Sequence, residues 1–190
     1  MRKSHFSGKE LWRVLGKDER NIKSLRQKLG AKIDVKRQRD NDNADILITG
    51  KNAMQEYVLS EILEALSSGF DLRIAILLED EEFVFKKVNL RTYARGSRLS
   101  FVRGRIVGSE GKSKKVIQSL TDCFISLSDN YVAIIGKPES IDLASKAIES
   151  LIRGTKHANV FKFLEKSQGT LKERAELLEE FEEEKRDGKN

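Results

Sequence analysis

The chain carries one pattern twice, and this internal repeat limits the folds that are open to it. Residues 14–17 (VLGK) align with residues 106–109 (IVGS), at an offset of 92 residues. After a loop that is six residues shorter in the second copy, residues 45–51 (DILITGK) align with residues 131–137 (YVAIIGK). Such self-similarity indicates a small structural unit that occurs twice.

The spacing of apolar residues predicts the same elements in both copies. Residues 20–29 and 112–121 have apolar side chains at helical spacing. Residues 31–36 and 124–128 alternate between apolar and polar, which is typical of half-buried strands. Each copy therefore contains two helices around a glycine loop, followed by a strand.

The remaining elements follow from glycine, proline and the flanking segments. Gly50 and Gly136 end the next strands, and Pro138 begins a helix, where its missing N–H does no harm. Residues 83–89 predict a leading strand for the second copy. The first copy has few residues before its first helix, so we expect its leading strand to be short or absent. The predicted order is strand, helix, glycine loop, helix, strand, strand, helix.

This order predicts an α+β fold, with a three-stranded sheet and three helices in each copy. A unit of this size alone would bury only about 60% of its unfolded surface, so we expect the two copies to pack together. Residues 71–82 predict a short apolar helix that joins the two cores. We place the first domain at residues 1–78, the second at 79–165 and a charged helical tail at 166–190.

The loop at residues 108–111 (GSEG) has the features of a phosphate-binding platform. Glycine has no Cβ, so a nucleic-acid backbone can come close to the main chain. The N-terminus of the following helix favours an anion, and apolar side chains, among them Ile117, can receive unstacked bases. The predicted RNA-binding residues are Arg103, Arg105, Ile106, Val107, Gly108, Ser109, Glu110, Gly111, Lys112, Lys114, Lys115 and Ile125.

The run at residues 107–117 (VGSEGKSKKVI), inside this repeated unit, resembles the KH family. In that family a GxxG loop clamps about four nucleotides of single-stranded RNA or DNA. The resemblance implies two tandem type I KH domains and an added C-terminal helix. It implies no cofactor and no catalytic residue.

The run at residues 151–165 (LIRGTKHANVFKFLE) is not part of a general KH unit. Together with residues 104–108 and 132–136 it resembles the archaeal and eukaryotic KH proteins that assist maturation of the small ribosomal subunit, and the short chain is similar to the archaeal form. The resemblance implies binding of single-stranded rRNA near the small-subunit 3′ end. It also implies contact with the PIN-domain endonuclease that trims this end, and allows contact with the α subunit of initiation factor two.

The first loop departs from the family pattern. Residues 16–19 read GKDE, so glutamate replaces the second glycine and puts a carboxylate where phosphate would approach. We therefore expect the first copy to bind RNA weakly or indirectly. In the second loop, Ser109 stands where the resemblance implies a basic residue.

The charge distribution agrees with a polyanionic ligand. The net charge is +6, and the segment from Arg13 to Arg39 contains ten basic residues and three acidic ones. The segment from Arg95 to Lys115 contains seven basic residues and only Glu110 as an acid. Neutralising phosphates with such blocks releases counterions. An ordinary solvated helix face would explain the first block by itself.

Composition also bears on location. The sequence has no apolar run of the roughly 20 residues that span a bilayer, and its N-terminus does not read as a signal peptide. The single cysteine, Cys123, suits a reducing compartment, so we expect a cytoplasmic protein in which this thiol is simply buried.

The sequence argues against catalysis. Residues 108–113 (GSEGKS) lack the earlier glycine of a P-loop, because position 106 is isoleucine. His5, His157 and Cys123 give no metal-ligand set, and the acidic run at residues 79–82 falls in a connector. We expect His157 to cap or pack at a helix start. The hypothesis is therefore a protein that is not an enzyme and holds no metal.

Several alternatives stay open. A general KH protein that binds RNA or regulates mRNA, or a scaffold with incidental RNA binding, would share this sequence pattern. Trp12 is expected in the core, from its spacing to Leu15, and Phe161 and Phe163 are expected to anchor the C-terminal helix. Residues 171–181 form an amphipathic stripe that packs back, binds a protein or stays solvated.

Overall fold

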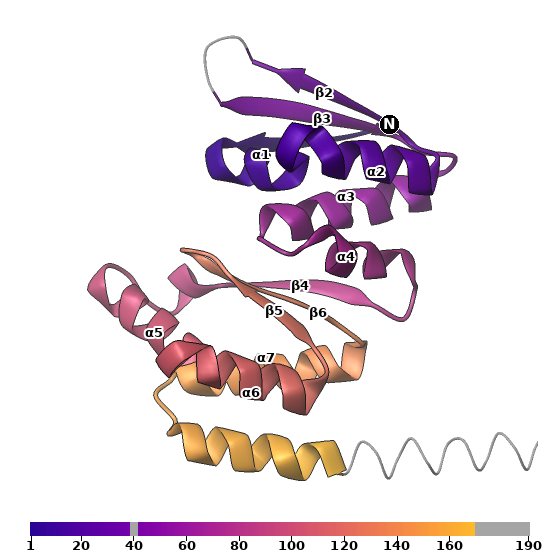
Figure 1. The fold of residues 1–190 in the computed structure, drawn as a ribbon. Helices are drawn as coiled ribbons and strands as arrows, with labels where there is room; N and C mark the ends of the chain where they lie inside the picture. The colour runs from indigo at the N-terminus through magenta and orange to yellow at the C-terminus, as the bar shows by residue number, and fades with distance from the viewer. Residues whose placement is uncertain (39–41, 170–190) are drawn as a thin grey trace, which may run out of the picture. The chain divides into compact units, whose positions relative to one another are not determined.

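The structure, a computed structural model, describes residues 1–38 and 42–169, and both repeats have the predicted order of elements (Figure 1). The first repeat contains β1 (Arg2–Ser7), α1 (Gly8–Leu15), η1 (Lys17–Glu19), α2 (Arg20–Leu29), β2 (Lys32–Arg37), β3 (Asn43–Thr49) and α3 (Ala53–Ser67). The connector contains α4 (Leu72–Ala75) and η2 (Ile76–Glu79). The second repeat contains β4 (Val84–Asn89), η3 (Leu90–Thr92), α5 (Ser97–Val107), η4 (Ser109–Gly111), α6 (Lys112–Thr121), β5 (Phe124–Leu127), β6 (Tyr131–Gly136) and α7 (Pro138–Ile152).

The chain forms two compact units that divide the second repeat. The first unit contains Met1–Tyr93 and Phe124–Pro138, and therefore includes the sheets of both repeats. The second unit contains Ala94–Cys123 and the chain from Glu139 onward, and therefore includes α5, α6 and almost all of α7. The domain boundaries inferred from the repeat, at residues 78 and 165, stay a prediction.

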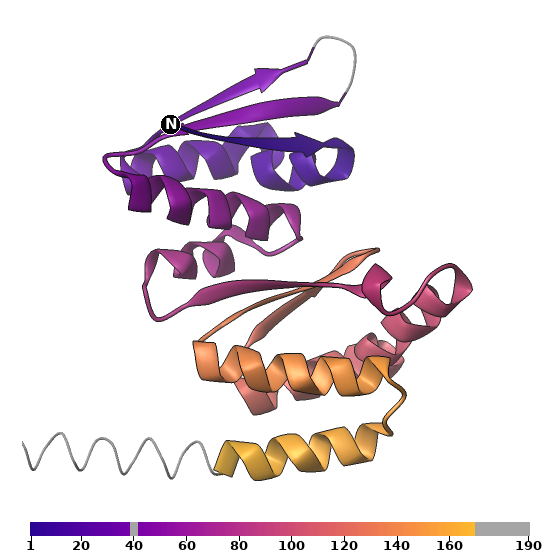
Figure 2. The ribbon, with the colours of Figure 1, turned by 180° about the vertical axis from the view of Figure 1, so that it is seen from behind.

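Both sheets are antiparallel, with the last strand of each repeat in the centre. The orders are β1-β3-β2 and β4-β6-β5. The expectation of a short or absent leading strand was wrong, because β1 has six residues, as many as β4, and pairs with β3 from Arg2 opposite Ile48 to Ser7 opposite Asn43. Figure 2 shows β1 running along β3. Phe6 is the one apolar residue of β1 and is only 3% exposed, so a single side chain fixes this edge strand to the core.

Helix ends lie where local chemistry sets them. Gly30 has φ of 60° and donates its N–H to the Arg26 carbonyl, which ends α2 at the predicted residue. The Asn52 side chain accepts from the Gln55 N–H at 2.8 Å and caps α3. Pro138 is the first residue of α7, as predicted.

The sheet of the second repeat packs on the helices of the first repeat, within the first unit. Ala133 and Ile135 on β6 belong to one buried cluster with the core of the first repeat, and Phe83 and Phe85 pack against it. The predicted connector helix is confirmed: it is made by α4 and η2, which add Ala75 and further apolar side chains to the same cluster. The two copies therefore share one core here, as their small size requires.

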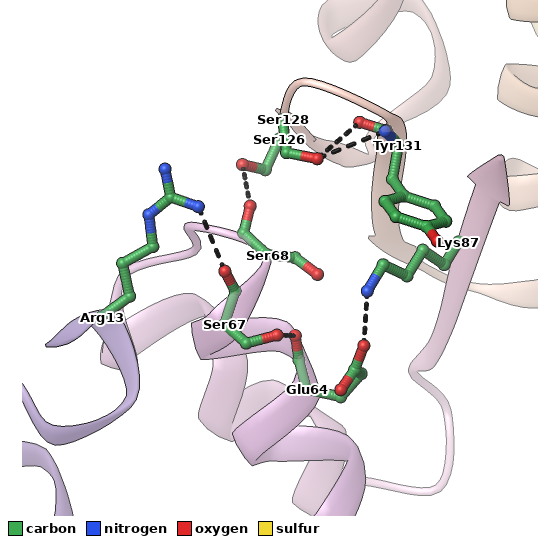
Figure 3. Close-up of polar contacts among 8 residues, drawn as sticks. All are labelled: Arg13, Glu64, Ser67, Ser68, Lys87, Ser126, Ser128 and Tyr131. Carbon is green, nitrogen blue, oxygen red and sulfur yellow. Dashed lines mark hydrogen bonds and ion pairs between the residues drawn. The ribbon is translucent and has the colours of Figure 1, made fainter. Parts of the chain in front are cut away.

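Polar contacts reinforce this packing (Figure 3). The Ser126 hydroxyl on β5 donates to the Ser68 carbonyl at the end of α3, at 2.8 Å. Lys87 on β4 pairs with Glu64 on α3, and its ammonium group lies 4.5 Å from the centre of the Tyr131 ring. These side chains satisfy polar groups where α3 meets the sheet of the second repeat.

In the second unit, residues 157–169 form a helix after α7. It lies beside α6 and α7 in both views. Val160 and Leu164 are 2% and 0% exposed, so they anchor it, whereas Phe163 is 43% exposed and Phe161 is half-buried. The expectation for Phe163 was therefore wrong. The amphipathic stripe at residues 171–181 lies outside the described residues.

Candidate nucleic-acid interface

The loop between α5 and α6 depends on its glycines in two different ways. Gly108 has φ of 73°, and a Cβ there would lie 2.6 Å from the Ser113 Cβ, so only glycine lets the first turn of α6 pack this closely. Gly111 has φ of 76°, and a Cβ there would meet nothing within 4 Å. Gly111 therefore provides a left-handed backbone and an open surface that a phosphate can approach.

The N-terminus of α6 has the properties of an anion site. No side chain caps it, because Gly111 is the N-cap residue. The first N–H groups of a helix have no partner within the helix, and its dipole adds positive charge there. Lys112 and Lys115 are exposed and Lys114 is half-buried, and none of the three forms an ion pair with any residue of the described chain. These groups can hold phosphates without first giving up an intramolecular partner.

The structure divides the other predicted site residues between surface and interior. Ser109 and Glu110 are exposed on the loop, and Val107 is half-buried just before it. Ile106 is 1% exposed and Ile125, on β5, is 3% exposed. The two isoleucines therefore serve the core, and Val107 is the predicted apolar residue at this position that retains accessible surface.

Arg105 and Arg103 lie on α5, and both are half-buried, whereas Lys112 and Lys115 are exposed. The Arg105 guanidinium donates to the Leu151 carbonyl at 3.0 Å and to the Thr155 carbonyl at 2.6 Å. The Arg105 carbonyl lies 2.8 Å from Nε2 of His157, the first residue of the last helix, which confirms the expectation of a packing histidine. The structure therefore uses the Arg105 guanidinium to hold the end of α7, and the predicted phosphate contact would have to compete with these two bonds.

Sequence reasoning missed an exposed aromatic residue on α5. Phe101 is 65% exposed, and its ring centre lies 6.0 Å from the Arg105 guanidinium carbon. Exposed aromatic rings stack on unpaired bases irrespective of base identity. The signal was the spacing of Phe101 and Arg105, four residues apart on one helix face.

The first loop retains the backbone of the second despite its different sequence. The φ angles are 69° and 73° at Gly16 and Gly108, 53° and 52° at Asp18 and Glu110, and 57° and 76° at Glu19 and Gly111. A Cβ at Gly16 would lie 2.9 Å from the Asn21 side chain, so this glycine too permits close packing. The two loops therefore differ in chemistry and share one geometry.

Glu19 accounts for that difference. Its carboxylate pairs with the Arg37 guanidinium of β2 at 2.8 Å, so Arg37 already has an anionic partner at this loop. Beside it lies a hollow of 150 Å³, lined in part by Trp12. Trp12 is 59% exposed, so the expectation that it lies in the core was wrong. The buried side of α1 is made by Leu11, Val14 and Leu15 instead.

Comparison with known proteins agrees with this geometry. Residues 84–169 match the model of the second KH domain of the PNO1 type, described as a eukaryotic type KH-domain (KH-domain type I), and residues 13–64 match the general KH domain. KH domain-containing protein MJ0443 from Methanocaldococcus jannaschii is 32% identical over 84% of this chain and 70% of its own length. The chain belongs to the KH-domain family.

Two further relatives carry informative names. Pre-rRNA-processing protein PNO1 of Debaryomyces hansenii is 32% identical over 66% of this chain and 52% of that protein. The chain thus spans about half the length of this fungal relative. A crystal structure of the a/eIF2alpha–aDim2p–rRNA complex from Pyrococcus horikoshii OT3 matches with a TM-score of 0.77 and 26% identity, over 89% of this chain and 95% of that one.

Three other features of the described residues concern membranes, metals and the cysteine. None of their helices is both long and apolar enough to cross a membrane. Residues 1–38 and 42–169 contain no group of three His, Cys, Asp or Glu side chains that is arranged to hold a metal ion. Cys123 is buried, as predicted, and burial raises the pKa of its thiol to about 11.

Proposed function

We propose that this protein is an RNA-binding ribosome-assembly factor that holds single-stranded rRNA near the 3′ end of the small subunit through its second repeat. The observation that carries the proposal is the contrast between the two loops. In the second, Gly111 leaves the helix N-terminus open, and Lys112 and Lys115 form no ion pair with the residues that the structure describes. In the first loop the backbone is the same, but Glu19 stands in place of the second glycine and forms an ion pair with Arg37.

The names of the relatives support ribosomal RNA as the class of RNA that is bound. Fungal relatives are named pre-rRNA-processing proteins, and the Pyrococcus horikoshii relative was crystallised with rRNA and a/eIF2alpha. We therefore propose rRNA and the α subunit of initiation factor two as partners of this protein. The PIN-domain endonuclease that trims the rRNA 3′ end is proposed as a further partner, from the resemblance in residues 151–165. Work on ribosomal RNA would place the protein in the cytoplasm.

The proposed role is non-catalytic. Holding RNA needs phosphate donors and surfaces for bases, and α6 together with Phe101 offers both. Cutting RNA needs an acid–base pair or metal ions fixed near the scissile bond. We expect the purified protein to leave an rRNA 3′-end substrate intact in magnesium or manganese. It should change cleavage of that substrate when the endonuclease is added, and intrinsic cleavage that survives repurification would contradict the proposal.

A matched pair of loop variants tests the assignment to the second repeat. Ser109→Asp with Glu110→Asp gives that loop two aspartates in its centre. Lys17→Asp gives the first loop the same two central residues, because position 18 is already aspartate. Aspartate tolerates the left-handed backbone found at position 110, so both folds should survive.

The expected result is unequal loss of affinity for a labelled single strand that ends in the small-subunit 3′ sequence. The second-loop variant should lose most of its binding, because Ser109→Asp adds a carboxylate that faces the phosphates, and Lys17→Asp should lose much less. Equal losses would refute the assignment. Sequencing of RNA recovered with the protein from cell extract tests the target: small-subunit 3′ ends support rRNA, and scattered transcripts would point to a general RNA-binding protein.

A further inference from the structure

The outer face of α2 in the first repeat is a surface that the loop-based function leaves unused. Ile22, Leu25 and Leu29 turn into the core and are at most 8% exposed. The outer positions carry four basic side chains, and the helix contains no acidic residue. The basic residues are Arg20, Lys23, Arg26 and Lys28.

Two surface hollows flank this helix. The first has a volume of 550 Å³ and lies between α2 and the start of α4, with Lys28 and Arg73 in its lining. The second has a volume of 500 Å³ and includes Lys17 and Lys23. Both include Arg20 and Ser24, so the two hollows adjoin along one side of α2.

The two hollows remain positive overall, because the acidic residues in their linings, Asp71 and Asp18, are fewer than the basic ones. The Asp71 carboxylate accepts from the Arg73 N–H at 3.0 Å and from its guanidinium at 3.3 Å, and these bonds, the backbone one foremost, lower the pKa of Asp71. Asp71 is therefore occupied as the cap of α4. Four other bases around the hollows form no ion pair with the described residues: Lys17, Arg20, Lys23 and Lys28.

We propose that this basic face of α2 binds the phosphate backbone of a folded, double-stranded part of the RNA whose single-stranded end the second repeat holds. The inference rests on the proposed function and adds a second contact, independent of both loops. Lys28 lies eight residues after Arg20, which on a helix is about 12 Å. Successive phosphates of one strand advance by about 3.4 Å along a DNA duplex and by less along an A-form RNA duplex. The distance from Arg20 to Lys28 therefore spans several phosphates and is longer than one small anion.

The lining also argues for backbone contact over base contact. The one aromatic residue of the two hollows, Phe70, is only 7% exposed, so it cannot stack on bases. Phosphate contacts position RNA without reading its sequence. An acidic protein segment would need apolar surface for specific docking, and Leu72 offers little because it is half-buried.

The test compares two RNAs and two charge-matched variants of the full chain. One RNA is the short single strand with the small-subunit 3′ sequence, and the other is the same strand preceded by a hairpin. The test variant is Lys23→Ala with Lys28→Ala, which removes one base from each hollow. The control is Lys36→Ala with Lys51→Ala, two exposed lysines outside both hollows.

We expect the test variant to bind the hairpin RNA roughly 10- to 100-fold more weakly at 0.1 M salt, with a slope of log affinity against log salt smaller by about 1.4–1.8. Its affinity for the short strand and the behaviour of the control should match the parent. Hairpin binding equal to that of the control would overturn the inference, and so would equal losses for both RNAs. If the parent itself fails to bind the short strand, the proposed function fails, and hairpin binding then shows whether α2 acts alone.

Discussion

Replacing Arg105 distinguishes a side chain that holds the protein from one that holds RNA. Its guanidinium donates to the carbonyls of Leu151, in the last turn of α7, and of Thr155 just beyond it. The last carbonyls of a helix lack partners within the helix, and a cation near them is favourable. Arg105→Ala removes both bonds, and it leaves the part-buried Leu151 carbonyl with only the bond from the Gly154 N–H at 3.1 Å. Arg105→Lys keeps the charge but cannot span both acceptors.

The magnitude follows from these two contacts. A hydrogen bond to a charged group contributes about 1.5–3 kcal/mol, and the part-buried bond to Leu151 should contribute near the lower value. The bond to Thr155 is exposed, so water replaces much of it and about 0.5 kcal/mol remains. Arg105→Ala should therefore lower the free energy of unfolding by about 2 kcal/mol, and Arg105→Lys should lower it by nearly as much. Because the guanidinium is occupied, the salt dependence of RNA binding should not change.

Urea unfolding and RNA titration over a range of salt measure the two effects separately. Arg153→Ala is the control, because its side chain is 72% exposed and its ion pair with Glu149 is 4.0 Å long. It should change the free energy of unfolding by less than about 0.5 kcal/mol. The reasoning is refuted if Arg105→Ala is as stable as the parent while its salt slope falls by about 0.7, the value for one lost phosphate contact on a single strand.

Three further predictions concern single features. Lys112→Ala with Lys115→Ala should weaken single-strand binding and flatten its salt slope by about 1.4; an unchanged slope would show that neither touches phosphate. Glu19→Gly should be about 1 kcal/mol more stable than Glu19→Ala in urea, because both lose the Arg37 pair but only alanine keeps a strained left-handed backbone; equal midpoints would contradict this strain. Cys123 should resist iodoacetamide at pH 8 until the protein is unfolded, and rapid labelling of the native thiol would contradict its burial. Because burial raises the pKa of this thiol from 9.0 to about 11, its contribution to stability should be present below pH 9 and disappear as the pH rises towards 11.

Elements with strong local signals were predictable from the sequence. The bounds of α2 and α6 match the apolar spacing to the residue, because a loop precedes each helix and Gly30 follows the first. β1 was not predictable, since its six residues contain one apolar side chain and its pairing with β3 joins residues about 40 positions apart. Strand formation there depends on tertiary context, which overrides local propensity.

The site was predicted in outline and missed in detail for the same physical reason. The open loop and the lysines after it are local features, and the sequence shows them directly. Arg105 finds its acceptors 46 and 50 residues away, and no periodicity reveals a side chain that bonds to backbone carbonyls. Trp12 had the correct spacing for a core residue, yet the buried stripe of α1 passes through its neighbour Leu11.

The sharing of one core by the first repeat and the second sheet has a consequence for how such a protein can change over generations. Ala133 and Ile135 of β6 are covered by the first repeat, so a gene fragment encoding the second repeat alone would give a sheet with one bare apolar face. Exposed faces of this kind promote aggregation. The two repeats therefore depend on each other for a complete core and cannot be separated without exposing it. A substitution in the first loop leaves this shared core intact, whereas a substitution on the buried face of α3 would disturb the packing of both repeats.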